Sequence, residues 1–180
     1  MIYLFLAPGF EEIEALAPLD ILRRAQLETA TVGVSGRLVT GAHHIGVEAD
    51  LAPMEVDLSA MEGIILPGGM PGTLNLEKSP AVQAALEAAA AGKKLIAAIC
   101  AAPSILGHKG LLQGRRATCF PGFEEQLTGA RLESGPVCRD GHIITAKGAG
   151  AAIEFGLAIA AYYKGEGAAS SLGAAMQCDR

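Results

Sequence analysis

The sequence lacks two features that would assign the chain to a membrane or to a nucleic acid. It has no apolar run approaching the ~20 residues of a membrane span. Its formal net charge is −5 and it has no cluster of Lys and Arg, which a nucleic-acid-binding face needs. Its first residues, MIYLFLAPG, are too short for a signal peptide and have no basic start. We therefore expect no membrane or nucleic-acid partner, and a cytoplasmic location.

The sequence also lacks paired cysteines and zinc-ligand spacing. Its four cysteines stand apart from one another: Cys100, Cys119, Cys138 and Cys178. This pattern favours free thiols in a reducing cytoplasm over a disulfide framework. Its four histidines have no ligand spacing for zinc either: His43, His44, His108 and His142. We interpret them as solvated or partly packed imidazoles, and we expect no metal and no cofactor.

The sequence contains enough hydrophobic residues to form the core of one ordered domain. Hydrophobic residues make up 51% of the 180 residues and charged residues only 18%. A disordered chain would carry far more charge. A chain of this length buries roughly 70% of the surface that its unfolded form exposes. We therefore expect a single domain over residues 1–180.

Short apolar runs alternate with helical patterns along the chain. The runs that predict strands cover residues 1–7, 29–34, 63–69, 93–100 and 142–148. Strands that alternate with helices are typical of an α/β protein with a mostly parallel sheet. The runs are continuously apolar, which indicates strands that helices cover on both faces.

Three helices are predicted from periodicity and from proline and glycine punctuation. They cover residues 13–25, 80–91 and 151–164. Pro18 lies inside the first helix and predicts a kink or a break there, because proline removes a backbone hydrogen bond. Gly165 is expected to end the third helix. Two hairpins are also predicted, one around Gly41 and one with a turn at Asp140 and Gly141.

Cys100 ends an apolar strand, and AAPS follows it as the start of a helix. Ligands of doubly wound sheets bind at the carboxyl ends of strands. Free N–H groups at a helix start stabilise a thiolate, so we predict a lowered pKa for Cys100. The layout resembles a nucleophile elbow, although GxSxG is absent. Cys100 as a small buried hydrophobic residue is the alternative.

Two further segments supply partners for a reactive thiol. Gly68 and Gly69 end another strand, and Gly69 and Ala101 N–H groups would form an oxyanion site. An ordinary tight turn explains the glycines equally simply. Glu14 has apolar neighbours at helical spacing, which would desolvate its carboxyl and raise its pKa. Such an acid can move a proton, whereas a solvated glutamate is the alternative.

Four motifs, APGFEEIEA, LPGGMPG, AAICAAP and KGAGAAIEF, carry a family resemblance over essentially the whole chain. In this order and spacing they resemble the ThiJ/PfpI superfamily, in the branch of the parkinsonism-associated deglycase and chaperone and its bacterial YajL-like relatives. The resemblance implies a flavodoxin-like α/β sandwich, with helices on both faces of the sheet, that forms a homodimer. It also implies a nucleophilic Cys100 beside a protonated Glu14, with backbone donors at Gly69 and Ala101.

Two departures from the family pattern bear on the chemistry. In the protease branch a histidine follows the cysteine, whereas Ala101 stands here, so a protease role loses its main support. Phe120 stands where the parkinsonism-associated protein has a histidine, and YajL-like members are similar to this chain in carrying phenylalanine there. His43 and Arg24 match positions near a dimer-related site. The resemblance thus adds Gly68, His43, Arg24 and Phe120 as possible pocket residues.

These features lead to one main hypothesis and its alternatives. We expect a cofactor-independent cysteine enzyme of glyoxalase or deglycase type that acts on methylglyoxal, glyoxal or their early adducts. The Cys100 thiolate would attack the aldehyde and Glu14 would transfer the proton. The alternative is a redox-responsive stress protein or chaperone that senses oxidation at Cys100. A binding module without chemistry keeps the same fold, because fold alone does not determine function.

Overall fold

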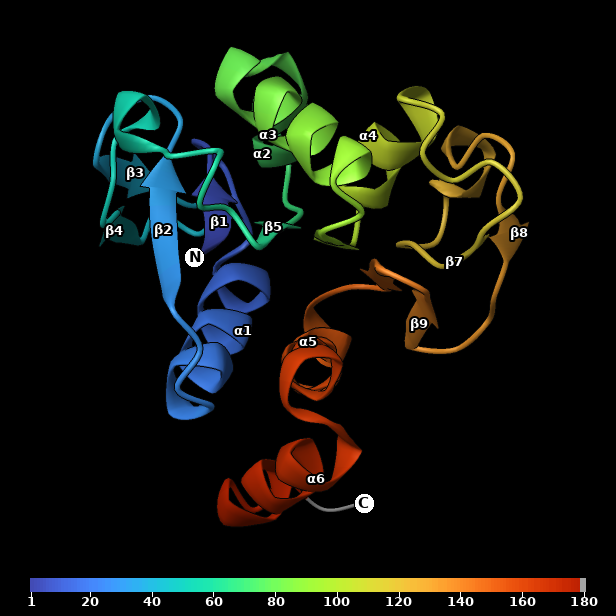
Figure 1. Cartoon of the computed structure of the whole chain (residues 1–180). Coiled ribbons are helices and arrows are strands. Elements are labelled where there is room, and N and C mark those ends of the chain that lie inside the picture. The colour runs from blue at the N-terminus through green and yellow to red at the C-terminus, as the bar shows by residue number, and fades with distance from the viewer. Residues whose placement is uncertain (179–180) are drawn as a thin grey trace.

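The computed structural model describes residues 1–178 and shows a sheet with helices on both faces (Figure 1). The six-stranded sheet has the order β2-β1-β5-β6-β10-β9. Its strands are β1 (Ile2–Leu6), β2 (Thr29–Gly33), β5 (Gly63–Leu66), β6 (Leu95–Ile99), β9 (Val137–Asp140) and β10 (Ile143–Ala146). All neighbours pair in parallel except β9 and β10. The predicted α/β fold with a mostly parallel sheet is confirmed.

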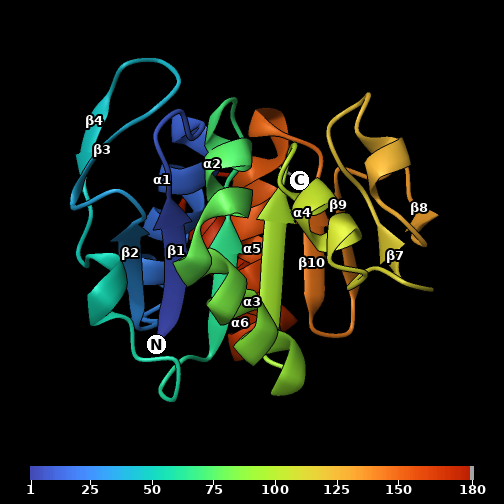
Figure 2. The ribbon, with the colours of Figure 1, turned by 90° about the horizontal axis from the view of Figure 1, so that it is seen from above.

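Helices cover the two faces of the sheet in separate groups (Figures 1 and 2). One face packs against α1 (Glu12–Arg24) and α5 (Ala152–Lys164), and α6 (Glu166–Ala175) packs on α5. The other face carries α2 (Gly72–Lys78), α3 (Pro80–Ala91) and α4 (Pro103–His108). No helix in the part of the chain that the structure describes is long and apolar enough to cross a membrane.

Smaller elements extend the two edges of the sheet. The two short strand pairs are β3 (Leu38–Thr40) with β4 (Gly46–Glu48), and β7 (Arg116–Ala117) with β8 (Arg131–Leu132). The 3-10 turns are η1 (Pro53–Glu55), η2 (Glu124–Gln126) and η3 (Ala149–Ala151). Figure 2 shows the β3–β4 hairpin at one edge and β7 and β8 at the other.

The apolar strand runs fill two cores, one on each face. In β1, Ile2, Leu4 and Leu6 belong to the core under α1 and α5. Tyr3 and Phe5 point to the opposite core, under the helices of the other face. Because successive side chains of a strand alternate between faces, a strand buried on both faces has no polar position. Each fully buried side chain of this size stabilises the fold by about 1.5–3 kcal/mol.

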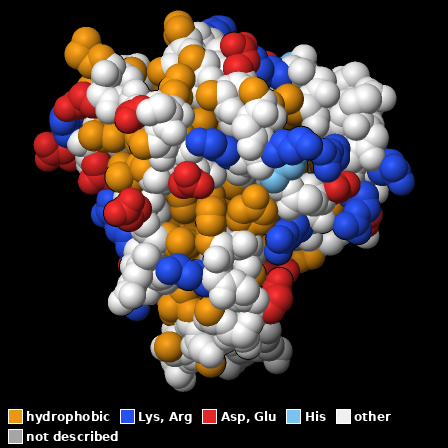
Figure 3. Space-filling view, viewed as in Figure 1, with side chains coloured by type: hydrophobic (Ala, Val, Ile, Leu, Met, Phe, Trp, Pro, Cys, Tyr) orange, Lys and Arg blue, Asp and Glu red, His pale blue; other side chains and the backbone are white. Residues whose placement is uncertain are grey.

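Figure 3 shows the end of the molecule at which the parallel strands begin. Hydrophobic side chains lie at its centre, and Lys and Arg gather on the side of β7 and β9. Arg116 and Arg139, on these strands, lie 3.9 Å from the carboxylates of Glu133 and Glu166 respectively. Acidic neighbours therefore offset part of this positive charge.

The predicted helices agree with the structure except at Pro18. Helix α1 runs unbroken through Pro18, so of the predicted kink or break the break is wrong, and the kink stays a prediction. Pro18 is buried, and its Cα lies 3.0 Å from the place a Cβ on Gly156 of α5 would occupy. Close packing between α1 and α5 offsets the lost hydrogen bond, which costs about 3 kcal/mol in a helix interior. Helix α5 ends before Gly165, which has a φ of +86°, as predicted.

Both predicted hairpins form, and the second differs in its turn. Strands β3 and β4 pair around a loop of residues 41–45, which contains Gly41. In the second hairpin Asp140 pairs with Ile143, so the turn is Gly141 and His142 and not Asp140 and Gly141. Gly141 has a φ of +63°, a conformation that glycine adopts without steric cost.

Candidate active site

Cys100 directly follows β6, in a left-handed backbone conformation with a φ of +65°. Its N–H donates to the Ala146 carbonyl at 2.9 Å, and its carbonyl accepts from Phe120 N–H at 2.8 Å. These bonds hold a conformation that costs a non-glycine residue about 1–3 kcal/mol and that is typical of functional sites. The helix expected directly after Cys100 begins at Pro103, after a turn.

The two predicted backbone donors meet at the cysteine sulfur. Gly69 and Ala101 N–H groups both hydrogen-bond the Cys100 thiol. Gly69 has a φ of +86°, which a residue with a Cβ rarely adopts. Two strand ends, those of β5 and β6, thus bring their N–H groups to one sulfur atom.

Glu14 reaches the same sulfur from the first turn of α1. Its side chain is only 1% exposed, and its Oε2 accepts from Gly68 N–H at 2.9 Å. Gly68 permits this arrangement, because a Cβ there would lie 2.6 Å from both the Cys100 Cβ and the Glu14 Oε2. The Ala149 N–H also donates to the Glu14 carboxyl. The buried, apolar setting expected for Glu14 is therefore present.

The carboxyl and the thiol have shifted pKa values. Burial raises the pKa of Glu14 to about 7, although hydrogen bonds from Cys100, Gly68 and Ala149 lower it. Burial, followed by the charge of an ionised Glu14 and the hydrogen bond to it, raises the pKa of Cys100 to about 12. The lowered thiol pKa that the sequence predicted is therefore wrong beside an ionised Glu14. Burial and the neighbouring carboxylate outweigh the Gly69 and Ala101 N–H groups.

Because the two groups share a hydrogen bond, their proton losses belong to the pair. The pair loses its first proton near pH 7 and its second near pH 12. Between these values it holds one proton and one negative charge. A thiolate on Cys100 with a protonated Glu14 is one of the two forms with that charge.

Phe120 lies beside the pair, on the segment between β7 and η2. Its side chain is 47% exposed, although it is large and apolar. A Cβ on Gly148 would lie 3.2 Å from the Phe120 Cδ2 and 3.7 Å from the Glu14 Oε1. Gly148 therefore lies next to both the phenyl ring and the carboxyl. The ring is on the same side of the site as Glu14.

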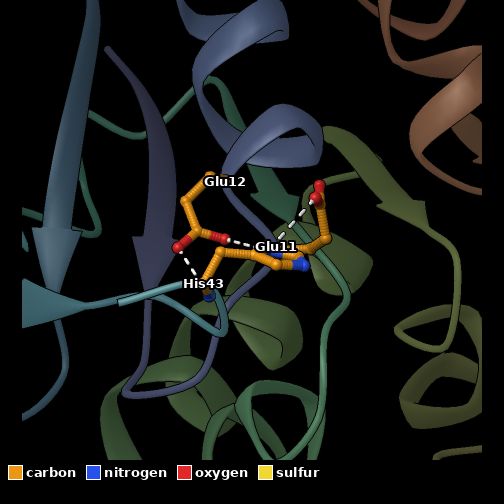
Figure 4. Close-up of side chains that lie close together, drawn as sticks. All are labelled: Glu11, Glu12 and His43. Carbon is orange, nitrogen blue, oxygen red and sulfur yellow. Dashed lines mark hydrogen bonds and ion pairs between the residues drawn. The ribbon is translucent and has the colours of Figure 1, made fainter. Parts of the chain in front are cut away.

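His43 lies on the β3–β4 loop and binds Glu12 (Figure 4). The Nδ1 of the His43 ring lies 2.8 Å from the Glu12 Oε2. The backbone N–H of His43 donates to the Glu12 Oε1, also at 2.8 Å. Burial alone would raise the pKa of Glu12, but the hydrogen bonds from His43 lower it. The Glu12 bonds in turn raise the pKa of the exposed His43 imidazole. Sequence spacing gave no signal for this pair, because the partners are 31 residues apart.

Arg24 lies at the opposite end of α1, about 15 Å along the helix axis from Glu14. Its Nε donates to Asp20 at 2.6 Å, and both side chains are exposed. Within one chain, Arg24 is therefore not part of the group around Cys100. Its predicted place near a dimer-related site stays a prediction.

Glu11, Glu12 and His43 have ligand atoms within 4.8 Å of one another, close enough to hold a metal ion together (Figure 4). Both carboxylates already have structural partners. The Glu11 Oε2 accepts from Glu14 N–H at 2.7 Å and caps α1, while Glu12 holds the β3–β4 loop. The tertiary structure assembles this cluster from two distant segments.

Two hollows in the described part of the chain are lined by residues other than Cys100 and Glu14. A groove of about 790 Å³ runs between α5 and α6. A second hollow, of about 200 Å³, is lined by Cys119, Pro121 and Lys147 among others. Cys100 and Glu14 line neither of them.

Comparison with known proteins finds relatives that match most of the chain. Residues 1–162 match the model of the DJ-1/PfpI family. The chain is 35% identical to the protein dj-1beta of Drosophila melanogaster over 158 residues, which are 86% of this chain and 84% of that protein. It is 32% identical to a glutathione-independent glyoxalase of Caenorhabditis elegans, covering 90% of this chain and 87% of the relative. A protein named deglycase from Pyrococcus abyssi is 33% identical, covering 71% and 76%.

Solved structures show the same fold. The oxidised DJ-1 of Toxoplasma gondii superimposes with a TM-score of 0.94 at 35% identity, covering 98% of this chain and 97% of that chain. A cysteine-to-alanine mutant of a DJ-1 superfamily protein of Salmonella typhimurium has a TM-score of 0.93 at 34% identity, covering 99% and 98%. The family match, the identities and the shared fold lead to one conclusion: this chain belongs to the DJ-1/PfpI family.

Proposed function

We propose that this protein is a cofactor-independent enzyme of glyoxalase or deglycase type. Its substrates would be methylglyoxal, glyoxal or the early adducts they form. One observation carries the proposal: the Cys100 thiol lies between two backbone N–H donors and the buried Glu14 carboxyl. The relatives named deglycase and glutathione-independent glyoxalase support the same reaction class.

In this mechanism the Cys100 thiolate adds to the aldehyde carbon, and the protonated Glu14 gives its proton to the new alkoxide, which completes a hemithioacetal and leaves Glu14 ionised. The Gly69 and Ala101 N–H groups, which contact the sulfur, stabilise negative charge as it moves to the oxygen. Glu14 then removes the proton from the former aldehyde carbon and returns it to the neighbouring carbon through an enediolate. The resulting thioester is hydrolysed by water, which releases the hydroxy acid and restores the thiol. The net reaction adds one water and needs no external oxidant or reductant.

The pKa of Glu14 suits this shuttle. A general acid-base group works best when its pKa lies near the operating pH, and that of Glu14 is about 7. A protonated Glu14 donates a hydrogen bond to the thiolate, whereas an ionised one repels it. Glu14 can therefore stabilise the nucleophile first and accept a proton afterwards.

The experiment is a measurement of methylglyoxal consumption and lactate formation by wild type, Cys100→Ser and Glu14→Gln. We expect Cys100→Ser to be inactive and Glu14→Gln to lose about 10²–10⁴-fold in kcat, the usual contribution of one acid-base group. Glu154→Gln, an exposed glutamate on α5, serves as the control and should match wild type. Lactate formation by Cys100→Ser at the wild-type rate would refute the proposal.

A second candidate is a redox-responsive protein that senses oxidation at Cys100. The half-buried thiol has donors around it that would hold a sulfinate: Gly69 N–H, Ala101 N–H and a protonated Glu14. The Toxoplasma gondii DJ-1 structure is of an oxidised form. Peroxide titration with mass spectrometry tests this role, which predicts sulfinate at Cys100 before any other cysteine is oxidised.

We also propose a cytoplasmic homodimer. Ile13 of α1, Ile45 of the β3–β4 loop and Ile153 of α5 are each about half exposed, and large apolar side chains of this kind suit an interface. Ile45 N–H also contacts Glu12, so the loop and α1 contribute to one surface. All four cysteines are free thiols, which suits a reducing compartment. Sedimentation equilibrium at micromolar concentration tests the dimer.

A further inference from the structure

Phe120 presents a half-exposed aromatic ring beside Glu14 at the Cys100 site. The ring is 47% exposed, although exposing a large apolar side chain to water is unfavourable. A phenyl group neither donates nor accepts a proton. The ring can therefore act on a reactant only through apolar contact and not through acid-base chemistry.

The backbone around Phe120 fixes the position of the ring. Its N–H donates to the Cys100 carbonyl at 2.8 Å, and its own carbonyl accepts from Phe123 N–H at 3.1 Å. The preceding residue, Cys119, is buried in the core. The Phe120 backbone is therefore hydrogen-bonded directly to the backbone of Cys100. Bonds on both its N–H and its carbonyl hold it in place.

Gly148 leaves room for the ring beside Glu14. The site of a Gly148 Cβ lies 3.2 Å from Phe120 Cδ2, 3.7 Å from Phe120 Cε2 and 3.7 Å from the Glu14 Oε1. The ring and the carboxyl therefore border the same small space. Glu14 would exchange a proton with the carbon next to the aldehyde carbon, so the substituent on that carbon has to lie near Glu14 and near the ring.

We propose that Phe120 is a specificity-determining residue, which makes the site select 2-oxoaldehydes with an apolar substituent, above all an aryl group, over unsubstituted glyoxal. This inference rests on the proposed function. An apolar substituent removes the exposed ring from water, and an aryl substituent adds an aromatic contact. Glyoxal has only a hydrogen at that position and gains neither contribution.

The test compares phenylglyoxal, methylglyoxal and glyoxal as substrates, by initial rates of mandelate, lactate and glycolate formation. Rates measured with Cys100→Ser are subtracted, because phenylglyoxal also reacts with arginine. The quantity of interest is the ratio of kcat/KM for phenylglyoxal to that for glyoxal. Intrinsic reactivity of the aldehydes cancels when this ratio is compared between variants.

We expect Phe120→Ala to lower this ratio about five- to tenfold, the effect of losing one aromatic contact. Phe120→Leu keeps an apolar side chain without the ring and should fall between wild type and Phe120→Ala. Met54→Ala is the matched control, because Met54 is a 92% exposed apolar residue in η1 and should leave the ratio unchanged. Thermal unfolding of each variant confirms that it is folded.

Two outcomes overturn the inference while leaving the proposed function in place. One is glyoxal turnover with the same ratio in wild type, Phe120→Leu and Phe120→Ala. The other is an equal change of the ratio in Met54→Ala, which would make the effect independent of the ring.

If wild type converts none of the three aldehydes, the proposed function fails, and selectivity is then measured without turnover. Each aldehyde, as a reversible adduct, protects Cys100 from alkylation by iodoacetamide. Weaker protection of Phe120→Ala by phenylglyoxal relative to glyoxal supports the inference, and unchanged relative protection refutes it.

Discussion

Glu14 on α1 and Cys100 after β6 form a hydrogen-bonded pair in which an ionised Glu14 raises the pKa of the thiol. Because burial also raises the pKa of Glu14 to about 7, the pair shares one proton just above neutral pH, and this proton is on either the carboxyl or the thiol. The predictions below follow from this pair and from the residues that hold it in position.

The first prediction concerns the pH dependence of thiol alkylation. In wild type, the rate of Cys100 alkylation by iodoacetamide should rise through a step near pH 7, where the pair loses its first proton. Glutamine does not ionise, so Glu14→Gln should have no step there. Its thiol should ionise with a pKa below the wild-type value of about 12, because the carboxylate charge is absent. Superimposable profiles of the two proteins would contradict the coupling.

The second prediction concerns stability. The folded pKa of Glu14, about 7, lies above its ordinary value of 4.5, so its stabilising contribution is full below pH 4.5 and is lost as pH rises through 7. The loss amounts to about 3 kcal/mol. Urea unfolding at pH 5 and pH 7.5 should show Glu14→Gln gaining stability relative to wild type at the higher pH. A difference between the two proteins that does not change with pH would exclude this linkage.

The third prediction concerns Gly68. Gly68→Ala places a Cβ 2.6 Å from both the Cys100 Cβ and the Glu14 Oε2, so the pair must separate. We expect a loss of about 1–3 kcal/mol of unfolding free energy, as in overpacked cores, together with loss of methylglyoxal turnover. Gly150→Ala is the control, because a Cβ at Gly150 meets nothing within 4 Å. Full activity of Gly68→Ala would show that the pair tolerates separation.

The fourth prediction concerns the order in which the thiols react. Cys100 is half-buried, whereas Cys119 and Cys138 are buried. The pKa of Cys119 is raised to about 11, by burial first and by the charge of Glu124, and that of Cys100 to about 12, so the expected order depends on exposure and on the thiolate that a protonated Glu14 permits. Peptide mapping after brief alkylation at pH 7.5 should therefore find Cys100 modified before Cys119 and Cys138. Earlier labelling of either buried cysteine would remove Cys100 as the nucleophile.

The fifth prediction concerns Glu12, which holds the β3–β4 loop. Its carboxylate accepts from the backbone N–H groups of His43 and Ile45 at 2.8 and 3.4 Å. Glu12→Gln keeps an acceptor oxygen but removes the charge that strengthens these bonds and the bond to the His43 ring, so it should cost about 1–3 kcal/mol of unfolding free energy. Hydrogen exchange of the His43 and Ile45 amides should become faster. Glu48→Gln, an exposed change in the same hairpin, should alter neither measurement.

The sequence alone determined the elements whose signals are local. The continuously apolar runs predicted the strands of the main parallel sheet, because burial on both faces removes polar positions along the chain. The end of helix α5 at Gly165 followed from glycine at a left-handed position. The position of Cys100 at a strand end, and hence at the functional edge of the sheet, was also visible in the sequence.

Tertiary structure decided what depends on contacts between distant segments. The α1–α5 contact keeps the helix unbroken at Pro18, and the pairing of Asp140 with Ile143 moves the turn by one residue. Burial and Glu14 reverse the pKa shift that a helix start alone predicts for Cys100. Glu12 and His43 are 31 residues apart in the sequence, and no local sequence pattern at either residue predicts the bond between them. Such contacts depend on strand order and packing, which bring together groups that local propensity treats as independent.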